Sequence, residues 1–234
     1  MKIDLHNFFL HYDEKNPKHF TAVEKLERIL ETKAPEELED TSEWVKEFRG
    51  QPTPSVVPSV LNVPWFPQTD NYRDAQRTCN SSSCAMCLEY FKPGTLKGAT
   101  GDDAYIRKVF SVGDTTDHSV QTKVLKDFGV PSHFNTNLGF VDLDRELATG
   151  KPVVIGIYHR GSLSAPTGGH MVVVIGKSSD GKFYICNDPY GSLNDGYTGP
   201  VTNGKGVKYS VEDLKYRWLE KGKDKTGWGR IFKP

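Results

Sequence analysis

Residues 168–189 read GGHMVVVIGKSSDGKFYICNDP, and this stretch decides the fold class. It contains two apolar segments, 170–176 and 182–186, on either side of the turn sequence SDG at 179–181. β-Branched and aromatic residues favour strands, and a short glycine-containing turn between two such segments predicts an antiparallel hairpin. A third apolar segment, 153–158, predicts one more strand.

The part of the chain before these strands has the apolar spacing of helices. Helices are predicted over 79–91, 102–110, 118–128 and 140–148. Asp102, Asp103 and Asp117 stand at helix starts, where a carboxylate can accept bonds from unpaired N–H groups, so we expect them to act as N-caps. Helices followed by antiparallel strands predict an α+β domain.

The first 60 residues differ from the rest. Residues 1–50 carry apolar side chains at helical spacing, among them Leu26 and Ile29, and predict a small helical segment. Residues 51–60 include three prolines, which break helices and predict a linker. We therefore expect a helical segment 1–50, a linker 51–60 and a main domain 61–234.

Charge and hydropathy disfavour several classes of protein. The chain has 30 lysine and arginine residues and 30 aspartate and glutamate residues, so its formal net charge is zero. A dedicated nucleic-acid binder needs a basic excess to neutralise phosphates, so we expect no nucleic-acid partner. No apolar run approaches the ~20 residues that cross a bilayer, so we expect no membrane insertion. The polar start MKIDLH does not resemble a secretory signal, and we expect a cytoplasmic protein.

The four cysteines predict reduced thiols, because they are few for a disulfide scaffold of this length. They are Cys79, Cys84, Cys87 and Cys186. Cys84 and Cys87 share a face of the predicted helix, and core packing is favoured over zinc because no second ligand pair lies at the usual spacing. Cys186 is expected to be buried in its strand, and we expect no metal and no cofactor.

Cys79 is the candidate nucleophile. It stands in the first turn of the predicted helix 79–91, where unpaired N–H groups and the positive end of the helix dipole favour a thiolate. A thiolate is the attacking species in acyl transfer. The alternative is a small buried hydrophobic residue, which is the common fate of a free cysteine.

His170 and Asp188 are the candidate partners of this thiol. His170 opens an apolar strand where packing requires no histidine, and it can act as general base. The hairpin brings the two strand ends together, so Asp188 is expected near the imidazole, where a carboxylate fixes the tautomer. Plain surface and turn roles are the alternatives for the two residues. Asn187 could also orient the histidine, although strand alternation points it to the opposite face.

Gln68 is the candidate oxyanion donor. Its side-chain amide could donate a hydrogen bond beside the backbone N–H of Cys79. Other side chains are expected to have ordinary surface or packing roles, the aromatic ones with a substrate groove as the alternative. They are His118, His133 and His159, and the aromatic residues Trp65, Tyr158, Tyr190 and Tyr197.

Four segments together carry a resemblance to a known family. They read VPWFPQ at 63–68, TCNSSSCAM at 78–86, GGHMVVVIG at 168–176 and NDPYG at 187–191. This order resembles the papain-fold cysteine peptidases related to bacteriocin leader processing. The resemblance implies a helix carrying Cys79, packed on an antiparallel sheet carrying His170 and Asp188, with Gln68 as the oxyanion residue and with no cofactor. Many members read Cys-Gly-Pro-Thr-Ser where this chain reads Cys-Asn-Ser-Ser-Ser, and this departure keeps all four catalytic residue types.

The serine-rich form resembles modules of phage lysis and tail proteins. This resemblance implies an endolysin that cuts peptide bonds in bacterial peptidoglycan and reaches the cell wall through a holin pore. Two alternatives stay open. One is a cysteine peptidase that processes a protein leader or precursor, and the other is a non-catalytic phage component that has kept the fold.

Overall fold

The computed structural model of the chain describes residues 60–98 and 101–233. The predicted helical segment 1–50 lies outside these residues, and so does the predicted linker 51–60 except for its last residue. Among the helices in the described ranges, none is both long and apolar enough to cross a bilayer.

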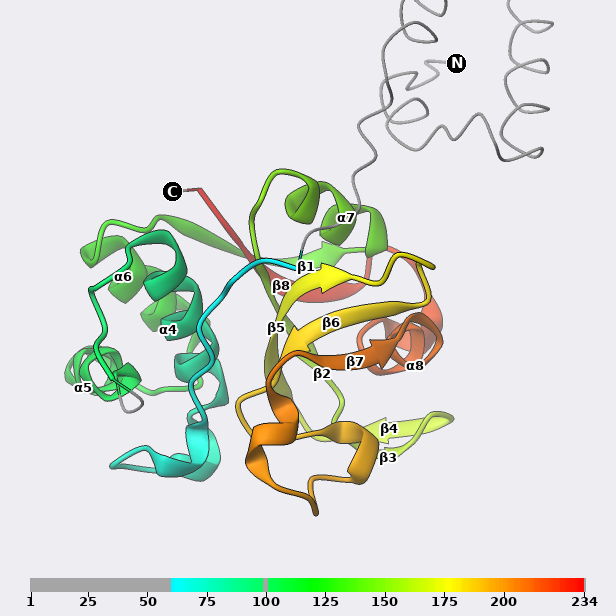
Figure 1. The fold of residues 1–234 in the computed structure, drawn as a ribbon, viewed down its shortest axis with the longest axis horizontal. Coiled ribbons are helices and arrows are strands. Elements are labelled where there is room, and N and C mark those ends of the chain that lie inside the picture. The colour runs from blue at the N-terminus through cyan, green and yellow to red at the C-terminus, as the bar shows by residue number, and fades with distance from the viewer. Residues whose placement is uncertain (1–59, 99–100, 234) are drawn as a thin grey trace, which may run out of the picture. The chain divides into compact units, whose positions relative to one another are not determined.

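A six-stranded antiparallel sheet forms the centre of the domain. Its strands are β1 (Ser132–Leu138), β2 (Val153–Ile157), β5 (His170–Lys177), β6 (Phe183–Asn187), β7 (Val207–Ser210) and β8 (Gly227–Phe232). They lie in the order β1-β8-β2-β5-β6-β7 (Figure 1). A separate hairpin, β3 (Arg160–Ser162) and β4 (Ala165–Thr167), connects β2 to β5.

Helices cover both faces of the sheet. They are α4 (Cys79–Phe91), α5 (Asp102–Val112), α6 (His118–Asp127), α7 (Phe140–Ala148) and α8 (Val211–Arg217), with short 3₁₀ turns η1 (Gln68–Asp70), η2 (Ala75–Arg77), η3 (Leu193–Asp195), η4 (Val201–Gly204) and η5 (Glu220–Gly222). In Figure 1, α4, α5 and α6 group on one side of the sheet and α8 lies on the other. Each face therefore buries its own apolar core.

Strand β5 explains why the central strands are apolar without a break. Met171 and Val173 pack into the core beneath α4, whereas Val172 and Val174 pack into the core beneath α7 and α8. Successive side chains of a strand point to opposite faces, so a strand covered on both faces needs apolar residues at every position. The sequence of β5 meets this requirement.

The predicted α+β class is confirmed, and the predicted elements are present to within about two residues at their ends. The predicted hairpin is present as β5 and β6, and it pairs Val174 with Cys186. Strands β1, β7 and β8, the β3–β4 hairpin and helix α8 were not predicted from the sequence. Strands β1 and β7 are the edges of the sheet, where exposed polar side chains interrupt the apolar pattern.

The predicted N-caps are confirmed in one case and wrong in another. Asp117 caps α6, because its carboxylate accepts bonds from the N–H groups of Ser119 and Val120. The N-cap of α5 is Gly101, and Asp102 is instead buried with its carboxylate accepting a bond from Ser82 at 2.7 Å.

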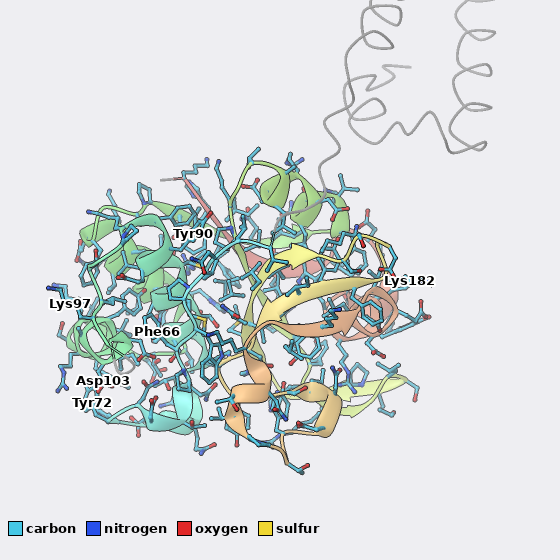
Figure 2. The ribbon with its side chains drawn as sticks, in the orientation of Figure 1. Phe66, Tyr72, Tyr90, Lys97, Asp103 and Lys182 are labelled. Carbon is cyan, nitrogen blue, oxygen red and sulfur yellow. The ribbon has the colours of Figure 1, made fainter. Side chains whose placement is uncertain are left out.

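Asp103 also binds outside its own helix. Its carboxylate accepts the N–H of Tyr72 at 3.2 Å, and Figure 2 shows the two side chains together at the outer side of α5. Together, Asp102 and Asp103 attach α5 to the segment around α4.

Candidate active site

Helix α4 begins at Cys79, as the sequence predicts. The carbonyl of Thr78 accepts the N–H of Ser82 at 2.9 Å and so closes the first helical turn. The Thr78 hydroxyl donates to the carbonyl of Ala75 at 3.0 Å and accepts a bond from the Asn71 amide at 2.8 Å. These contacts fix the chain where it enters the helix, and with it the position of the thiol.

The start of β5 lies against the first turns of α4. Ser83 donates from its hydroxyl to the carbonyl of Met171 at 3.0 Å, so the residue after His170 is tied to the helix that carries Cys79. This contact brings the thiol and the imidazole together across the two layers, so that each side chain shifts the pKa of the other.

The environment of Cys79 favours its thiolate. Burial, the largest influence, would raise the pKa of the thiol, yet the net effect is a lower pKa. The imidazole of His170, through its donor nitrogen and its positive charge, is the main reason for the lower pKa, and the backbone N–H groups of Met171 and Asn80 add to it. Hydrogen bonds and an adjacent positive charge stabilise the anion more than burial destabilises it.

His170 is held by Asp188. The Nε2 atom of the imidazole lies 2.7 Å from Oδ1 of the carboxylate, and both side chains are buried. Burial alone would lower the pKa of His170, but the charge of Asp188 and this hydrogen bond raise it well above its usual value. Because Nε2 is bonded to Asp188, Nδ1 is the ring nitrogen that remains for Cys79.

The side chain of Gln68 is buried and lies against the turn just before Cys79. Its Nε2 atom donates to the carbonyl of Ala75 at 2.8 Å, and its backbone N–H donates to the carbonyl of Pro189 at 2.8 Å. Its Oε1 atom is buried and has no partner among the described residues. An amide nitrogen carries two hydrogens, so one N–H remains beyond the bond to Ala75.

Asn187 points away from the imidazole, as strand alternation predicts. Its amide donates to the carbonyl of Val63 at 3.0 Å, and its side-chain oxygen accepts the N–H of Gly206 at 3.0 Å. The side chain therefore secures neighbouring segments, whereas Asp188, the next residue, faces His170.

The expectation that His159 is a plain surface residue is wrong. Its ring lies 5.4 Å from the ring of His170, and Nδ1 is buried without a hydrogen-bond partner in the described structure. Burial first, and then the charge of His170, lower the pKa of His159 to about 4, so it stays neutral near pH 7. Gly168 leaves room for it, since a Cβ there would come within 2.8 Å of the His159 ring. No signal in the sequence marks this contact.

His118 also differs from its expected surface role. Its ring stacks on Phe134 with centroids 3.5 Å apart, and Nδ1 lies 3.3 Å from the amide nitrogen of Asn80. Burial, followed by the charge of Arg230, lowers its pKa to about 4. His118 is a packing residue of the helical layer.

Tyrosines surround the paired His170 and Asp188. The rings of Tyr190 and Tyr197 lie 6.1 and 5.8 Å from that of His170. The Tyr190 hydroxyl donates to Gln76 at 3.0 Å and so joins the loop after β6 to the turn before α4. Trp65 donates from its indole to the backbone carbonyl of Asp188 at 2.9 Å. Tyr190, Tyr197 and Trp65 therefore help to shape the site as well as to pack it.

A pocket of about 590 Å³ opens beside the β3–β4 hairpin. Its lining is mostly apolar or aromatic, with two charged residues, and comprises Tyr158, Leu163, Ser164, Pro166, Tyr216, Glu220 and Lys221. Tyr158 precedes His159 in the chain, so the pocket adjoins the segment that reaches the imidazole.

The remaining cysteines are core residues, as predicted. Cys84 and Cys87 lie in the core beneath α4, Cys186 lies in the other core, and all three are fully buried. Only Cys79 is partly exposed. Across residues 60–98 and 101–233, no group of three or more histidine, cysteine, aspartate or glutamate side chains is placed to share a metal ion.

Residues 60–226 match the model of the Peptidase_C39 like family. No curated protein matches the chain. A solved structure of a putative C39-like peptidase from Bacillus anthracis is 16% identical, with a TM-score of 0.51, and the alignment covers 75% of this chain and 97% of that chain. A double glycine motif protease from an AMS/PCAT transporter, solved in complex with the leader peptide, is 19% identical with a TM-score of 0.46, covering 74% and 93%. The similarity to the Bacillus anthracis structure shows the papain-like fold.

Proposed function

The chain belongs to the Peptidase_C39 like family, a family of cysteine peptidases, and we propose that it hydrolyses amide bonds with Cys79 as nucleophile. The contact between His170 and Asp188 at 2.7 Å, with the same imidazole lowering the pKa of the Cys79 thiol, is the observation that carries this proposal. The lowered pKa of Cys79 and the raised pKa of His170 both favour a thiolate–imidazolium pair.

The first half of the reaction forms a thioester. The Cys79 thiolate attacks the carbonyl carbon of the scissile amide, and the carbonyl oxygen becomes an oxyanion. The backbone N–H of Cys79 and the remaining N–H of Gln68 donate hydrogen bonds to this oxyanion. His170 gives its Nδ1 proton to the amine nitrogen, the C–N bond breaks, and the amine leaves.

The second half releases the acyl group. His170, now neutral, accepts a proton from water, and the resulting hydroxide attacks the thioester carbonyl. The C–S bond breaks, a carboxylic acid leaves and gives its proton to the solvent, and the thiolate–imidazolium pair is restored. Asp188 accepts the bond from the imidazole throughout and holds it in place.

For the substrate, we propose the peptide part of bacterial peptidoglycan, cut by a phage-type endolysin. The sequence TCNSSSCAM at residues 78–86, which resembles lysis and tail modules, supports this assignment. All polar side chains of its first helical turns are buried, so the serines serve the position of the helix rather than contact with a ligand.

A protein or peptide precursor is the second candidate substrate, and the pocket beside the β3–β4 hairpin favours it. The pocket exposes Leu163, Pro166 and two tyrosines, which suit a large apolar side chain. Peptidoglycan stem peptides consist mainly of small and charged residues, which gain little from such a pocket.

Two substrates separate these candidates. Purified protein is incubated with isolated peptidoglycan sacculi and, separately, with an unfolded protein such as reduced casein, and new amino termini are identified by mass spectrometry. Cleavage of the sacculi with new amino termini supports the endolysin, and cleavage of casein alone supports the precursor peptidase. New reducing ends on the glycan chains would contradict amide hydrolysis.

Cysteine variants test the nucleophile. Cys79→Ala should abolish turnover on whichever substrate is cut, while Cys87→Ala, which removes a buried thiol from the same helix, should retain it. Full turnover by folded Cys79→Ala would overturn the proposed mechanism.

A further inference from the structure

The Asp188 carboxylate accepts more hydrogen bonds than its role beside His170 requires. Oδ1 accepts the bond from His170 and also the N–H of Tyr190 at 2.9 Å. Oδ2 accepts the hydroxyls of Tyr209 at 2.7 Å and of Tyr197 at 3.1 Å. A fully buried carboxylate with four donors is held in one orientation, because rotation would break several bonds.

We propose that Tyr197 and Tyr209 are positioning residues that hold the Asp188 carboxylate aligned with His170, and so set the charge of the Cys79–His170 pair. The inference rests on the proposed function, because it matters only if the pair is catalytic. Neither tyrosine touches the reacting atoms, and both act through Asp188.

The hydroxyl protons of the two tyrosines are directed at the carboxylate. The Tyr209 hydroxyl accepts the N–H of Leu193 at 3.1 Å, so its own proton is available to Asp188. Burial, and next the negative charge of Asp188, raise the pKa of both hydroxyls far above the usual value. They therefore remain donors throughout the pH range in which a cysteine peptidase works.

Tyr197 adopts a backbone conformation that is costly for its residue type. Its φ of 61° lies in the left-handed region, which is unfavourable for a residue with a Cβ. Such strain persists where surrounding contacts fix it, and it concentrates at functional sites. Here the contacts are the bond to Asp188 and the rings of Tyr190 and His170, at 5.2 and 5.8 Å.

The hydroxyls of Tyr197 and Tyr209 affect the pH at which the Cys79 thiol ionises. Without one hydroxyl, Oδ2 loses a strong bond and the carboxylate can turn away from Nε2 of His170. The imidazolium is then less stabilised, so less positive charge faces Cys79 and a higher pH is needed to form the thiolate.

The test measures thiolate formation without a known substrate. The rate at which iodoacetamide alkylates Cys79 is followed from pH 4 to 10 by intact mass, because the thiolate is the reacting form. Tyr209→Phe and Tyr197→Phe are each expected to move the midpoint upward by about one pH unit, which makes alkylation below the midpoint roughly ten-fold slower. The double variant should move it further.

Tyr184→Phe is the matched control. Its hydroxyl donates to Asp144 at 2.6 Å, and it lies buried in the same core as Tyr209, away from His170. Tyr184→Phe should lower the melting temperature of the protein without moving the pH midpoint of Cys79 alkylation. If the Tyr197 and Tyr209 variants behave like this control, the inference is wrong.

The outcome also separates the inference from the proposed function. If Cys79 in the wild-type protein titrates as an ordinary thiol, the thiolate–imidazolium pair itself is absent and the proposed function fails with it. If the wild-type midpoint is low and both single variants keep it, only the role of the tyrosines is excluded. Should Tyr209→Phe fail to fold, Tyr197→Phe, at a partly exposed position, decides the question.

Discussion

The backbone N–H of Gln68 bonds to Pro189, and its side-chain amide bonds to Ala75 through one of its two N–H groups. The other side-chain N–H is the proposed oxyanion donor. Gln68→Ala should lower kcat by about 10²–10³, the usual effect of losing one oxyanion donor, and should leave KM nearly unchanged. Steady-state kinetics on the substrate identified above checks this. Because alkylation of Cys79 involves no oxyanion, its rate should stay at the wild-type value, and a parallel loss would point to a misplaced thiol instead.

Single residues of the site differ in how far the sequence predicts them. Asp188 could be placed near His170 because a short hairpin fixes which strand ends meet. Tyr209 could not, since its strand β7 joins the sheet after an irregular loop and no local pattern reveals the pairing. The position of His159 cannot be predicted either, because no local pattern reveals that its ring lies beside the imidazole, where Gly168 leaves room for it.

The contact between helices α4 and α5 predicts a pH-dependent stability. Burial raises the pKa of Asp102 to about 7, the bond from Ser82 opposes this, and the charges of Asp70 and Asp103 add to it. The folded protein thus holds this proton more tightly than the unfolded chain, whose aspartate has the ordinary value of 3.8. The contribution to stability is therefore complete below about pH 4 and is lost as the pH rises through 7.

Asp102→Asn removes this titration and keeps an oxygen that can accept the bond from Ser82. We expect the variant to match the wild type near pH 4 and to exceed its free energy of unfolding at pH 8 by up to a few kcal/mol. Urea denaturation at both pH values measures the difference in free energy of unfolding between variant and wild type. The contributions of the other titrating groups are common to both proteins and cancel in this difference. A variant that is less stable than the wild type at pH 8 would show that the carboxylate is needed as an anion.

At the scale of secondary structure, the strands that the sequence predicts all lie inside the sheet. Strands β2 and β5 lie inside the sheet and are apolar throughout, so their sequences identify them. Helix α4 has no exposed polar face over most of its length, because it is buried on all sides from Asn80 to Leu88. Its polar side chains bond to α5, to β5 and to the loop before α6, which no spacing rule reveals.

At the scale of the whole domain, two adjacent residues at the end of β6 have different roles. Asn187 contributes to stability, and Asp188 contributes to the proposed chemistry. Asn187 secures Val63 and Gly206 on one side, while Asp188 serves His170 on the other. Asn187→Ala leaves a buried carbonyl and an N–H without these partners, so we expect it to lower the free energy of unfolding by roughly 2–4 kcal/mol. Urea denaturation of the full chain measures this loss.

Asp188→Asn provides the comparison, because it changes the charge with little change in shape. It should raise the pH midpoint of Cys79 alkylation, since the imidazolium loses its anionic partner. Folded Asn187→Ala should keep the wild-type midpoint despite its lower stability, because its side chain does not reach the imidazole. A midpoint that moves equally in both variants would mean that the neighbouring segments, and not the carboxylate, determine the charge of the catalytic pair.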